Sequence, residues 1–147
     1  MAGNRCEPLF AFWPKIPECK KRLGSLPNNR LEGKKMKVLV VNAGSSSMKF
    51  TLFSMGKEQV LAKGLFERLG TDKPNLIYKR ADGAKFEGVI PVKNHVDALK
   101  AICEKLIDPE IGVIKKMSEI EAFGHRVVHG GERATRPVLV SSDVKEI

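Results

Sequence analysis

The sequence has few features that would point to a membrane, a disulfide framework or a structural metal site. No apolar run approaches the roughly 18 residues that span a bilayer. The short run Leu9–Trp13 is ended by Pro14, so it predicts no export signal, and we expect a cytoplasmic protein. Only three cysteines occur, without CxxC spacing, which favours neither disulfides nor zinc. We expect Cys103 to be a small core residue.

A strongly basic chain raises the question of a nucleic-acid partner. The 147 residues carry a formal net charge of +9, and residues 1–35 hold eight basic and three acidic side chains with four of the eight prolines. We interpret this segment as a basic, proline-rich and disordered extension, followed by a folded part over residues 36–147. Nucleic acid is therefore the least favoured partner. A docking peptide anchored by Phe10, Phe12 and Trp13 is an alternative role for the extension.

From Met36 onward, short apolar runs and turn residues predict mostly strands and one helix. The run at 37–41 is continuous and β-branched, so we expect it to be buried on both faces. In the next strand, Met48, Phe50 and Leu52 should share one face. The predicted elements are strands at 37–41, 48–54 and 59–69 in an antiparallel meander, a hairpin at 75–92 with a two-residue Asp-Gly turn in 81–83, a helix at 94–107, a strand at 123–129 and the start of a helix at 141–147.

The helix prediction depends on its ends and on one apolar stripe. Asn94 is a favourable N-cap, Asp97 occupies the capping-box position, and Asp108-Pro109 ends the helix. The residues expected on the buried stripe are Val96, Leu99, Cys103, Leu106 and Ile107. One complete helix leaves one face of the sheet poorly covered, which indicates an incomplete domain.

The stretch Asn42–Lys49 (NAGSSSMK) has the composition of an anion-binding turn. Gly44 allows close approach of a ligand, and the serines offer hydroxyl and backbone N–H donors that can surround phosphate oxygens. Lys49 adds a positive charge, and Asn42 supplies a hard oxygen ligand suited to magnesium. The stretch matches neither a P-loop nor a dinucleotide fingerprint, so a serine-rich hairpin turn without function stays open.

A second polar stretch, Gly124–Glu132 (GHRVVHGGE), surrounds two valines. In a strand, Arg126 faces away from His125 and His129. An arginine in apolar sequence usually holds an anion, and a carboxylate matches its fork geometry. Two alternatives remain: a metal site formed by the two histidines, and His125 as a hydrogen-bonded core residue.

Together, VLVVNAGSSSMKF and GHRVVHGGE resemble the N-terminal part of the acetate kinases. The resemblance runs from Met36 to the chain end. It implies an α/β fold, a ribonuclease-H-like (actin/hexokinase-like) N-terminal domain with a mixed sheet and helices, here incomplete. It also implies reversible phosphoryl transfer from ATP to acetate, giving acetyl phosphate and ADP with Mg²⁺, in a cytoplasmic homodimer. Propionate kinases of the same family are an alternative, and a non-catalytic nucleotide-binding remnant is another.

The resemblance also implies roles for individual residues. Asn42 would help to hold magnesium, and Lys49, Ser45 and Ser47 would contact the nucleotide phosphates. Arg126 would bind the acetate carboxylate or the transferred phosphoryl group. The family's catalytic aspartate and adenosine-binding domain have no match in this sequence, so no catalytic residue is assigned. We therefore expect no turnover by these 147 residues alone.

Overall fold

The computed structural model describes residues 36–126 and 138–139. Strand is the commonest secondary structure among these residues, as the alternating apolar pattern predicts. The strands are β1 (Lys37–Ala43), β2 (Met48–Ser54), β3 (Gln59–Glu67), β4 (Asn75–Arg80), β5 (Lys85–Val89) and β6 (Ile120–His125). The helices are α1 (His95–Leu106) and the short 3-10 turns η3 (Met55–Lys57) and η4 (Met117–Glu119). The extension at 1–35 and the helix start at 141–147 lie outside the described residues.

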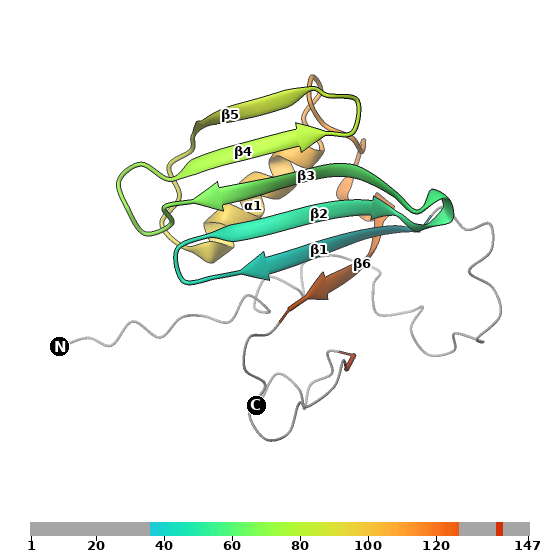
Figure 1. The fold of residues 1–147 in the computed structure, drawn as a ribbon, viewed down its shortest axis with the longest axis horizontal. Coiled ribbons are helices and arrows are strands. Elements are labelled where there is room, and N and C mark those ends of the chain that lie inside the picture. The colour runs from blue at the N-terminus through green and yellow to red at the C-terminus, as the bar shows by residue number, and fades with distance from the viewer. Residues whose placement is uncertain (1–35, 127–137, 140–147) are drawn as a thin grey trace.

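The strands form a single mixed sheet in the order β5-β4-β3-β2-β1-β6. Strands β1 to β5 are joined as consecutive antiparallel pairs. Strand β6 pairs parallel to β1 after the long connection through α1. Figure 1 shows α1 behind the sheet and β6 at its lower edge, pointing the same way as β1. The predicted antiparallel meander and mixed α/β class are confirmed.

The hydrophobic core lies between α1 and one face of the sheet. Met48, Phe50 and Leu52 are buried on that face, as predicted, while Lys49 is exposed on the other. Tyr78 is fully buried; its ring stacks on Phe50 with 6.1 Å between centroids. The Tyr78 hydroxyl donates to the Ile111 carbonyl at 3.0 Å. Burial raises its pKa to about 12, so the group stays a neutral donor.

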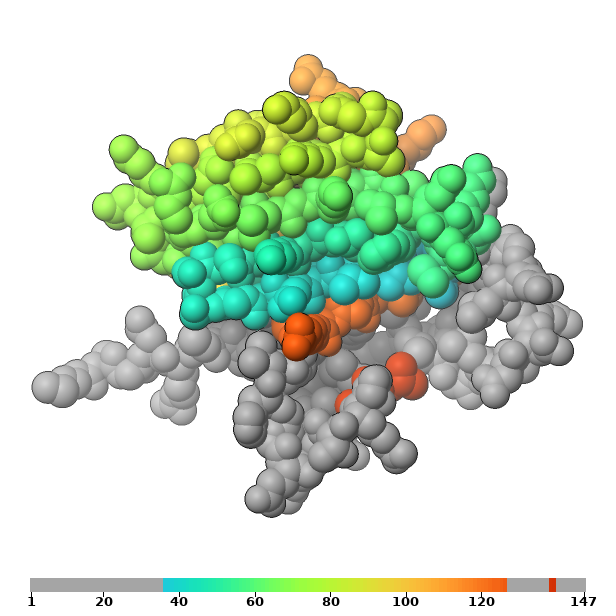
Figure 2. Space-filling model, in the orientation of Figure 1, coloured from blue at the N-terminus to red at the C-terminus, as the bar shows by residue number. Residues whose placement is uncertain are grey.

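The prediction that β1 is buried on both faces is wrong. Leu39 and Val41 are buried against α1, whereas Val40 on the opposite face is 37% exposed. The physical reason is that α1 covers only one side, and the described residues place no helix on the other. Figure 2 shows this second face directly, with the side chains of β1 to β5 open to solvent.

Helix α1 begins as predicted but buries a different stripe. The Asn94 side chain accepts a hydrogen bond from the Asp97 N–H at 2.9 Å, which confirms the N-cap. The Asp97 carboxylate instead accepts from the Lys93 N–H at 3.4 Å, one residue before the position a capping box requires. The buried residues are Ala98, Ala101, Ile102 and Leu106.

The stripe prediction is confirmed at Leu106, but it missed the two alanines that face the core, because it favoured large apolar side chains. Small residues let the helix backbone approach the sheet, so Ala98 and Ala101 face the core. Ile107 is 39% exposed and Cys103 is only half-buried. Burial still raises the pKa of the Cys103 thiol to about 11, which keeps it protonated and unreactive.

The hairpin β4–β5 forms where predicted, but its turn is longer than two residues. The Arg80 N–H donates to the Ala84 carbonyl at 2.8 Å, so three residues, 81–83, lie between the bonded pair. Within the loop only Gly83 has a left-handed φ, of 93°, whereas a type I′ turn needs two such residues. The Ala84 N–H also donates to Asp82 Oδ1 at 3.2 Å, which explains why the aspartate favours the turn.

The boundaries of β3 and β6 also differ from the predictions. Strand β3 ends at Glu67, and Leu69 is buried in the following loop. Strand β6 begins at Ile120, three residues earlier than predicted. Its parallel register to β1 shifts between Lys37 and Val38. The predicted part of this strand beyond Arg126 lies outside the described residues.

Candidate functional site

The serine-rich turn between β1 and β2 is tightly closed. The Gly44 N–H donates to the Ser47 carbonyl at 2.8 Å. A Cβ atom added to Gly44 would lie 3.2 Å from Ser47 Oγ, so the position favours glycine. The turn therefore joins two strands, as the sequence predicts, and presents its exposed residues Ser45 and Ser46 at the end of the sheet.

Two carbonyl groups of this turn accept hydrogen bonds from other segments of the chain. The Ser46 carbonyl accepts from the Leu69 N–H at 2.9 Å, and the Gly44 carbonyl lies 2.6 Å from His95 Nε2. By contrast, within residues 36–126 no hydrogen bond is made by the backbone N–H groups of Ser45, Ser46 or Ser47. Consecutive unpaired N–H groups form a concavity of positive potential that suits an anion.

Asn42 and Lys49 flank this turn as a direct cross-strand pair. Opposite residues of an antiparallel pair project from the same face, so both side chains lie on the open face of the sheet. Asn42 is half-buried and Lys49 is exposed. These two residues, which lie on either side of the turn in the sequence, are thus also neighbours in the structure.

Strand β6 brings Arg126 to the same end of the sheet. Val41 pairs with His125 in the parallel register, and the Arg126 N–H donates to the Val41 carbonyl at 3.4 Å. Because parallel strands run in the same direction, Asn42 and Arg126 follow their strands at one common edge. Alternation of side chains then places Arg126 on the side of Asn42.

The cations of this end have no carboxylate partner within the described ranges. The ion pairs among the described residues join other side chains: Lys37–Glu119, Arg80–Asp82, Lys100–Asp97 and Lys105–Asp108. Lys49 and exposed Arg126 are therefore uncompensated beside a turn of unpaired N–H groups. This arrangement can hold phosphate or carboxylate groups.

A magnesium ion fits this end only as a lightly held one. Asn42 offers a single amide oxygen, and no group of three or more acidic, histidine or cysteine side chains gathers among the described residues. Magnesium in phosphoryl-transfer sites usually keeps several waters and binds substrate phosphates with one or two protein oxygens. The donor set matches that pattern rather than a cage built by the protein.

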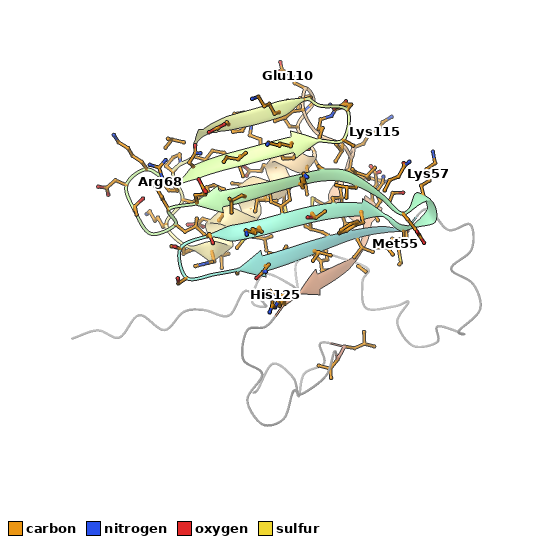
Figure 3. All side chains as sticks on the ribbon, in the orientation of Figure 1. Met55, Lys57, Arg68, Glu110, Lys115 and His125 are labelled. Carbon is orange, nitrogen blue, oxygen red and sulfur yellow. The ribbon has the colours of Figure 1, made fainter. Side chains whose placement is uncertain are left out.

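The interpretation of His125 as a core residue is wrong. Its side chain is exposed, because β6 is the outer strand of the described sheet. Figure 3 shows His125 at the free end of β6. The chain is extended through this residue, so the helical spacing of a two-histidine metal site does not begin there. His129 lies outside the described residues.

The open sheet face carries a row of lysines that runs from β3 to the β4–β5 hairpin. Lys63, Lys79 and Lys85 are direct neighbours across β3, β4 and β5, and all three are exposed. No carboxylate of the described part pairs with them. Such a row raises the local concentration of anions around the sheet.

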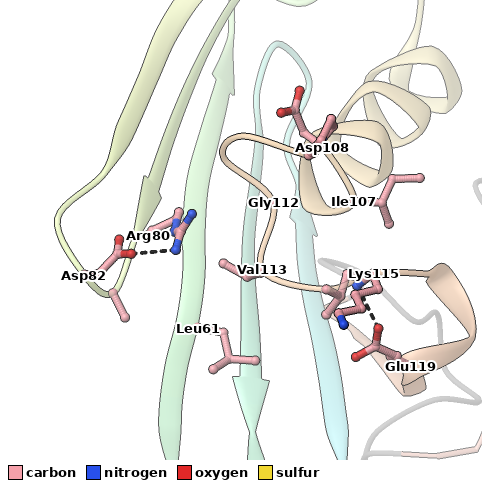
Figure 4. Close-up of a pocket in the computed structure, with 12 residues that line it drawn as sticks. Leu61, Arg80, Asp82, Ile107, Asp108, Gly112, Val113, Lys115 and Glu119 are labelled. Atoms are coloured by element: carbon pink, nitrogen blue, oxygen red, sulfur yellow. Dashed lines mark hydrogen bonds and ion pairs between the residues drawn. The ribbon is translucent and has the colours of Figure 1, made fainter.

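The opposite end of the strands contains a shallow hollow of about 760 Å³ between the β3–β4 edge and the loop after α1. Figure 4 shows two of its polar contacts. Arg80 pairs with Asp82 at 2.6 Å, and the Glu119 carboxylate accepts from the Lys115 N–H at 2.7 Å. Arg80 Nε is buried without a hydrogen-bond partner.

The carboxylates beside this hollow are held in their charged form. Backbone N–H groups of Glu110 and Ile111 lower the pKa of Asp108, and the Lys37 ammonium lowers that of Glu119. These groups fasten the loop of residues 107–119 and the start of β1. We therefore assign the hollow a structural role.

Comparison with known proteins identifies the family. The family model described as the acetokinase family matches residues 37–147. The chain belongs to the acetokinase family. Acetate kinases of Coprothermobacter proteolyticus and Methanosarcina acetivorans are 54% identical over 112 residues and 50% identical over 111 residues. Each match covers 76% of this chain, but only 28% and 27% of the relative.

Solved structures of the family share the fold. The crystal structure of Porphyromonas gingivalis acetate kinase matches with a TM-score of 0.70 and 40% identity, over 74% of this chain and 27% of that one. A propionate kinase from Francisella tularensis matches with a TM-score of 0.64 and 32% identity, over 76% and 27%. The mixed sheet and α1 are thus part of an actin/hexokinase-like fold, and the sequence resemblance is confirmed at the level of family.

Two contacts of the site were not predictable from local sequence. His95 lies 51 residues from Gly44, and its position after the capping Asn94 marks only a helix start. Leu69 contributes a backbone N–H, which has no sequence signature. Long-range pairing of this kind requires the register of the whole sheet.

Proposed function

We propose that this chain forms the phosphate- and acetate-binding part of an acetate kinase. That enzyme would transfer a phosphoryl group reversibly from ATP to acetate, giving acetyl phosphate and ADP. The observation that carries the proposal is the register of β6, β1 and β2. It gathers Arg126, Asn42 and Lys49 around a turn with three unpaired N–H groups.

Each group has a role that its chemistry supports. The N–H groups of the turn, with the Ser45 and Ser47 hydroxyls, cradle phosphate oxygens, and Lys49 adds charge at the rim. Arg126 binds the acetate carboxylate or the transferred phosphoryl group through its planar fork. The Asn42 amide oxygen would be a ligand to magnesium, which neutralises phosphate charge when bound. Positioning and charge stabilisation of this kind account for most of the catalysis in phosphoryl transfer.

The proposal assigns no catalytic residue to this chain. Asn42, Lys49, Arg126 and the turn provide no carboxylate or other proton acceptor. The chain spans about 27% of the length of the relatives it matches. We propose that the remaining chemistry and the adenosine site belong to the part of the relatives that this chain does not match, and that residues 1–35 are an extension outside the kinase domain.

The wider expectations rest on the family alone. From membership of the family we propose acetate and ATP as substrates, and a cytoplasmic homodimer as the assembly. No helix of the described part is long and apolar enough to cross a membrane. A propionate kinase is the second candidate, since the solved structure of one shares 32% identity with this chain.

A chimera tests the proposal. The matched 27% of the Porphyromonas gingivalis acetate kinase is replaced by residues 37–147 of this chain. We expect acetyl phosphate formation, lost on Lys49→Ala or Arg126→Ala and kept on Lys57→Ala, a change of an exposed lysine in η3. Thermal unfolding of each chimera checks folding.

The outcomes separate the candidate functions. A kcat/KM that is higher for acetate than for propionate supports an acetate kinase, and the reverse order supports the second candidate. A folded chimera that binds ATP without turnover contradicts the proposal and favours a non-catalytic binding remnant.

A further inference from the structure

His95 connects the start of α1 to the anion-binding turn. It is the first residue of the helix, and its Nε2 atom lies 2.6 Å from the Gly44 carbonyl oxygen. A carbonyl oxygen only accepts, so the ring nitrogen is the donor. The Asn94 cap fixes where the helix begins and therefore where the ring can reach.

This contact determines the direction of an N–H group that it does not touch. In a trans peptide the C=O of one residue and the N–H of the next point in opposite directions. A Gly44 carbonyl held toward His95 therefore aims the Ser45 N–H away from α1. The Ser46 carbonyl, held by the Leu69 N–H at 2.9 Å, aims the Ser47 N–H in the same manner.

We propose that His95 is a positioning residue that presets the turn for phosphate. The inference rests on the proposed function in that the anion is a phosphate group. Donors fixed in advance lose less conformational freedom when the ligand binds, so they bind more tightly than donors on a mobile turn. The simpler alternative is that His95 only attaches the helix to the sheet.

The variants are chosen to separate these two roles. His95→Ala removes the donor. His95→Gln keeps an N–H group that can reach a carbonyl oxygen, and should restore most of the effect. Glu104→Ala, an exposed change near the far end of α1, controls for altered helix stability.

The first measurement uses the complete 147-residue chain without ligand. Amide hydrogen exchange, followed by NMR, reports the Gly44 N–H, which donates to the Ser47 carbonyl at 2.8 Å. Gly112, whose N–H donates to the Asp108 carbonyl at 2.8 Å at the opposite end of the sheet, is the internal reference. We expect faster exchange at Gly44 in His95→Ala, recovery in His95→Gln, and no change at Gly112.

The second measurement is titration of the same chains with pyrophosphate. We expect the affinity of His95→Ala to fall by about 3- to 10-fold, the effect of one ordinary hydrogen bond, with recovery in His95→Gln. Unchanged exchange at Gly44 overturns the inference whatever the affinity. Faster exchange with unchanged pyrophosphate affinity overturns it as well. If His95→Ala exchanges faster at Gly44 but the unsubstituted chain binds no pyrophosphate, the contact does position the turn. The proposed function is then overturned instead.

Discussion

The two ends of the sheet treat charge in opposite ways. At the end formed by the 42–49 segment and Arg126, the Lys49 and Arg126 side chains and the backbone N–H groups of residues 45–47 have no partner among the described residues. At the other end, Lys37, Arg80 and Lys105 each form an ion pair, and the Asp108 carboxylate accepts backbone hydrogen bonds. Figure 3 places the two ends at opposite sides, with Arg68 near one and Lys115 near the other.

The anion site proposed above rests on unsatisfied donors of the turn and not on a hollow. The measurable hollow lies at the end where ion pairs and backbone bonds fasten the loop. What distinguishes the end that fits an anion is the direction of hydrogen-bonding groups: carbonyls held inward and N–H groups left outward.

The largest expected effect comes from removing a cation at the open end. In the chimera, Arg126→Ala should lower kcat/KM for acetate by about 10- to 100-fold, because a hydrogen bond to a charged group contributes roughly 1.5–3 kcal/mol. The loss for ATP should be much smaller. Lys105→Ala, which breaks an ion pair at the other end, should change neither value by more than about twofold. Equal losses for both substrates in Arg126→Ala would refute its role.

A change midway between the ends should weaken the whole sheet. A Cβ atom at position 64 would lie 2.4 Å from the Ile77 carbonyl oxygen and 2.5 Å from the Phe50 ring. We therefore expect Gly64→Ala to reduce the free energy of unfolding by about 1–3 kcal/mol. Urea unfolding measures this change.

The control for that substitution is another glycine of the same sheet. At Gly124 an added Cβ atom meets only Val40 side-chain atoms, at 3.5 Å and beyond. Gly124→Ala should leave the urea midpoint nearly unchanged. A similar loss in both variants would mean that glycine flexibility, rather than close packing under Gly64, determines the result.

At the end with the ion pairs, the stability of the fold should depend on pH. The Lys37 ammonium lowers the pKa of Glu119 from its usual 4.5, so the carboxylate stabilises the fold above that pH and the contribution disappears as pH falls below it. Glu119→Gln should lower the free energy of unfolding at pH 7 by less than about 1 kcal/mol. Thermal unfolding measures this change. The difference should vanish in acid. A Glu87→Gln control, on the exposed face of β5, should show no such dependence.

The smallest effect concerns the basic row on the open face. Lys79 lies directly between Lys63 and Lys85, and like charges placed opposite one another destabilise a sheet. Lys79→Glu should therefore raise the free energy of unfolding by about 0.2–1 kcal/mol. Lys57→Glu, away from the row, is the comparison. The gain should shrink in 1 M salt, and a salt-independent gain would exclude charge as its cause.

Much of this fold could be predicted from local pattern. The turn at 44–47, the meander, the Asn94 cap and the face shared by Met48, Phe50 and Leu52 follow from short-range rules. Three of the failures have one common cause. Burial of β1, the stripe on α1 and the exposure of His125 all depend on which elements pack together, and sequence pattern alone does not determine that.

The candidate site divides in the same way. Asn42, Lys49 and the serines are close in sequence, so their grouping was predictable. Arg126 reaches them only through the parallel β1–β6 register, and His95 only through packing of α1. Their assigned roles stay proposals until ligand binding is measured.

The most direct test of the difference between the two ends is an NMR titration of the 147-residue chain with pyrophosphate and magnesium. We expect chemical-shift changes at the amides of Ser45, Ser46 and Ser47. The changes should be smaller at Lys49 and Arg126, and absent at Gly112 and Lys115. Changes centred on Arg80 and Lys115 would place the anion site in the hollow at the opposite end. That result would contradict the assignment of function to the unpaired donors of the turn.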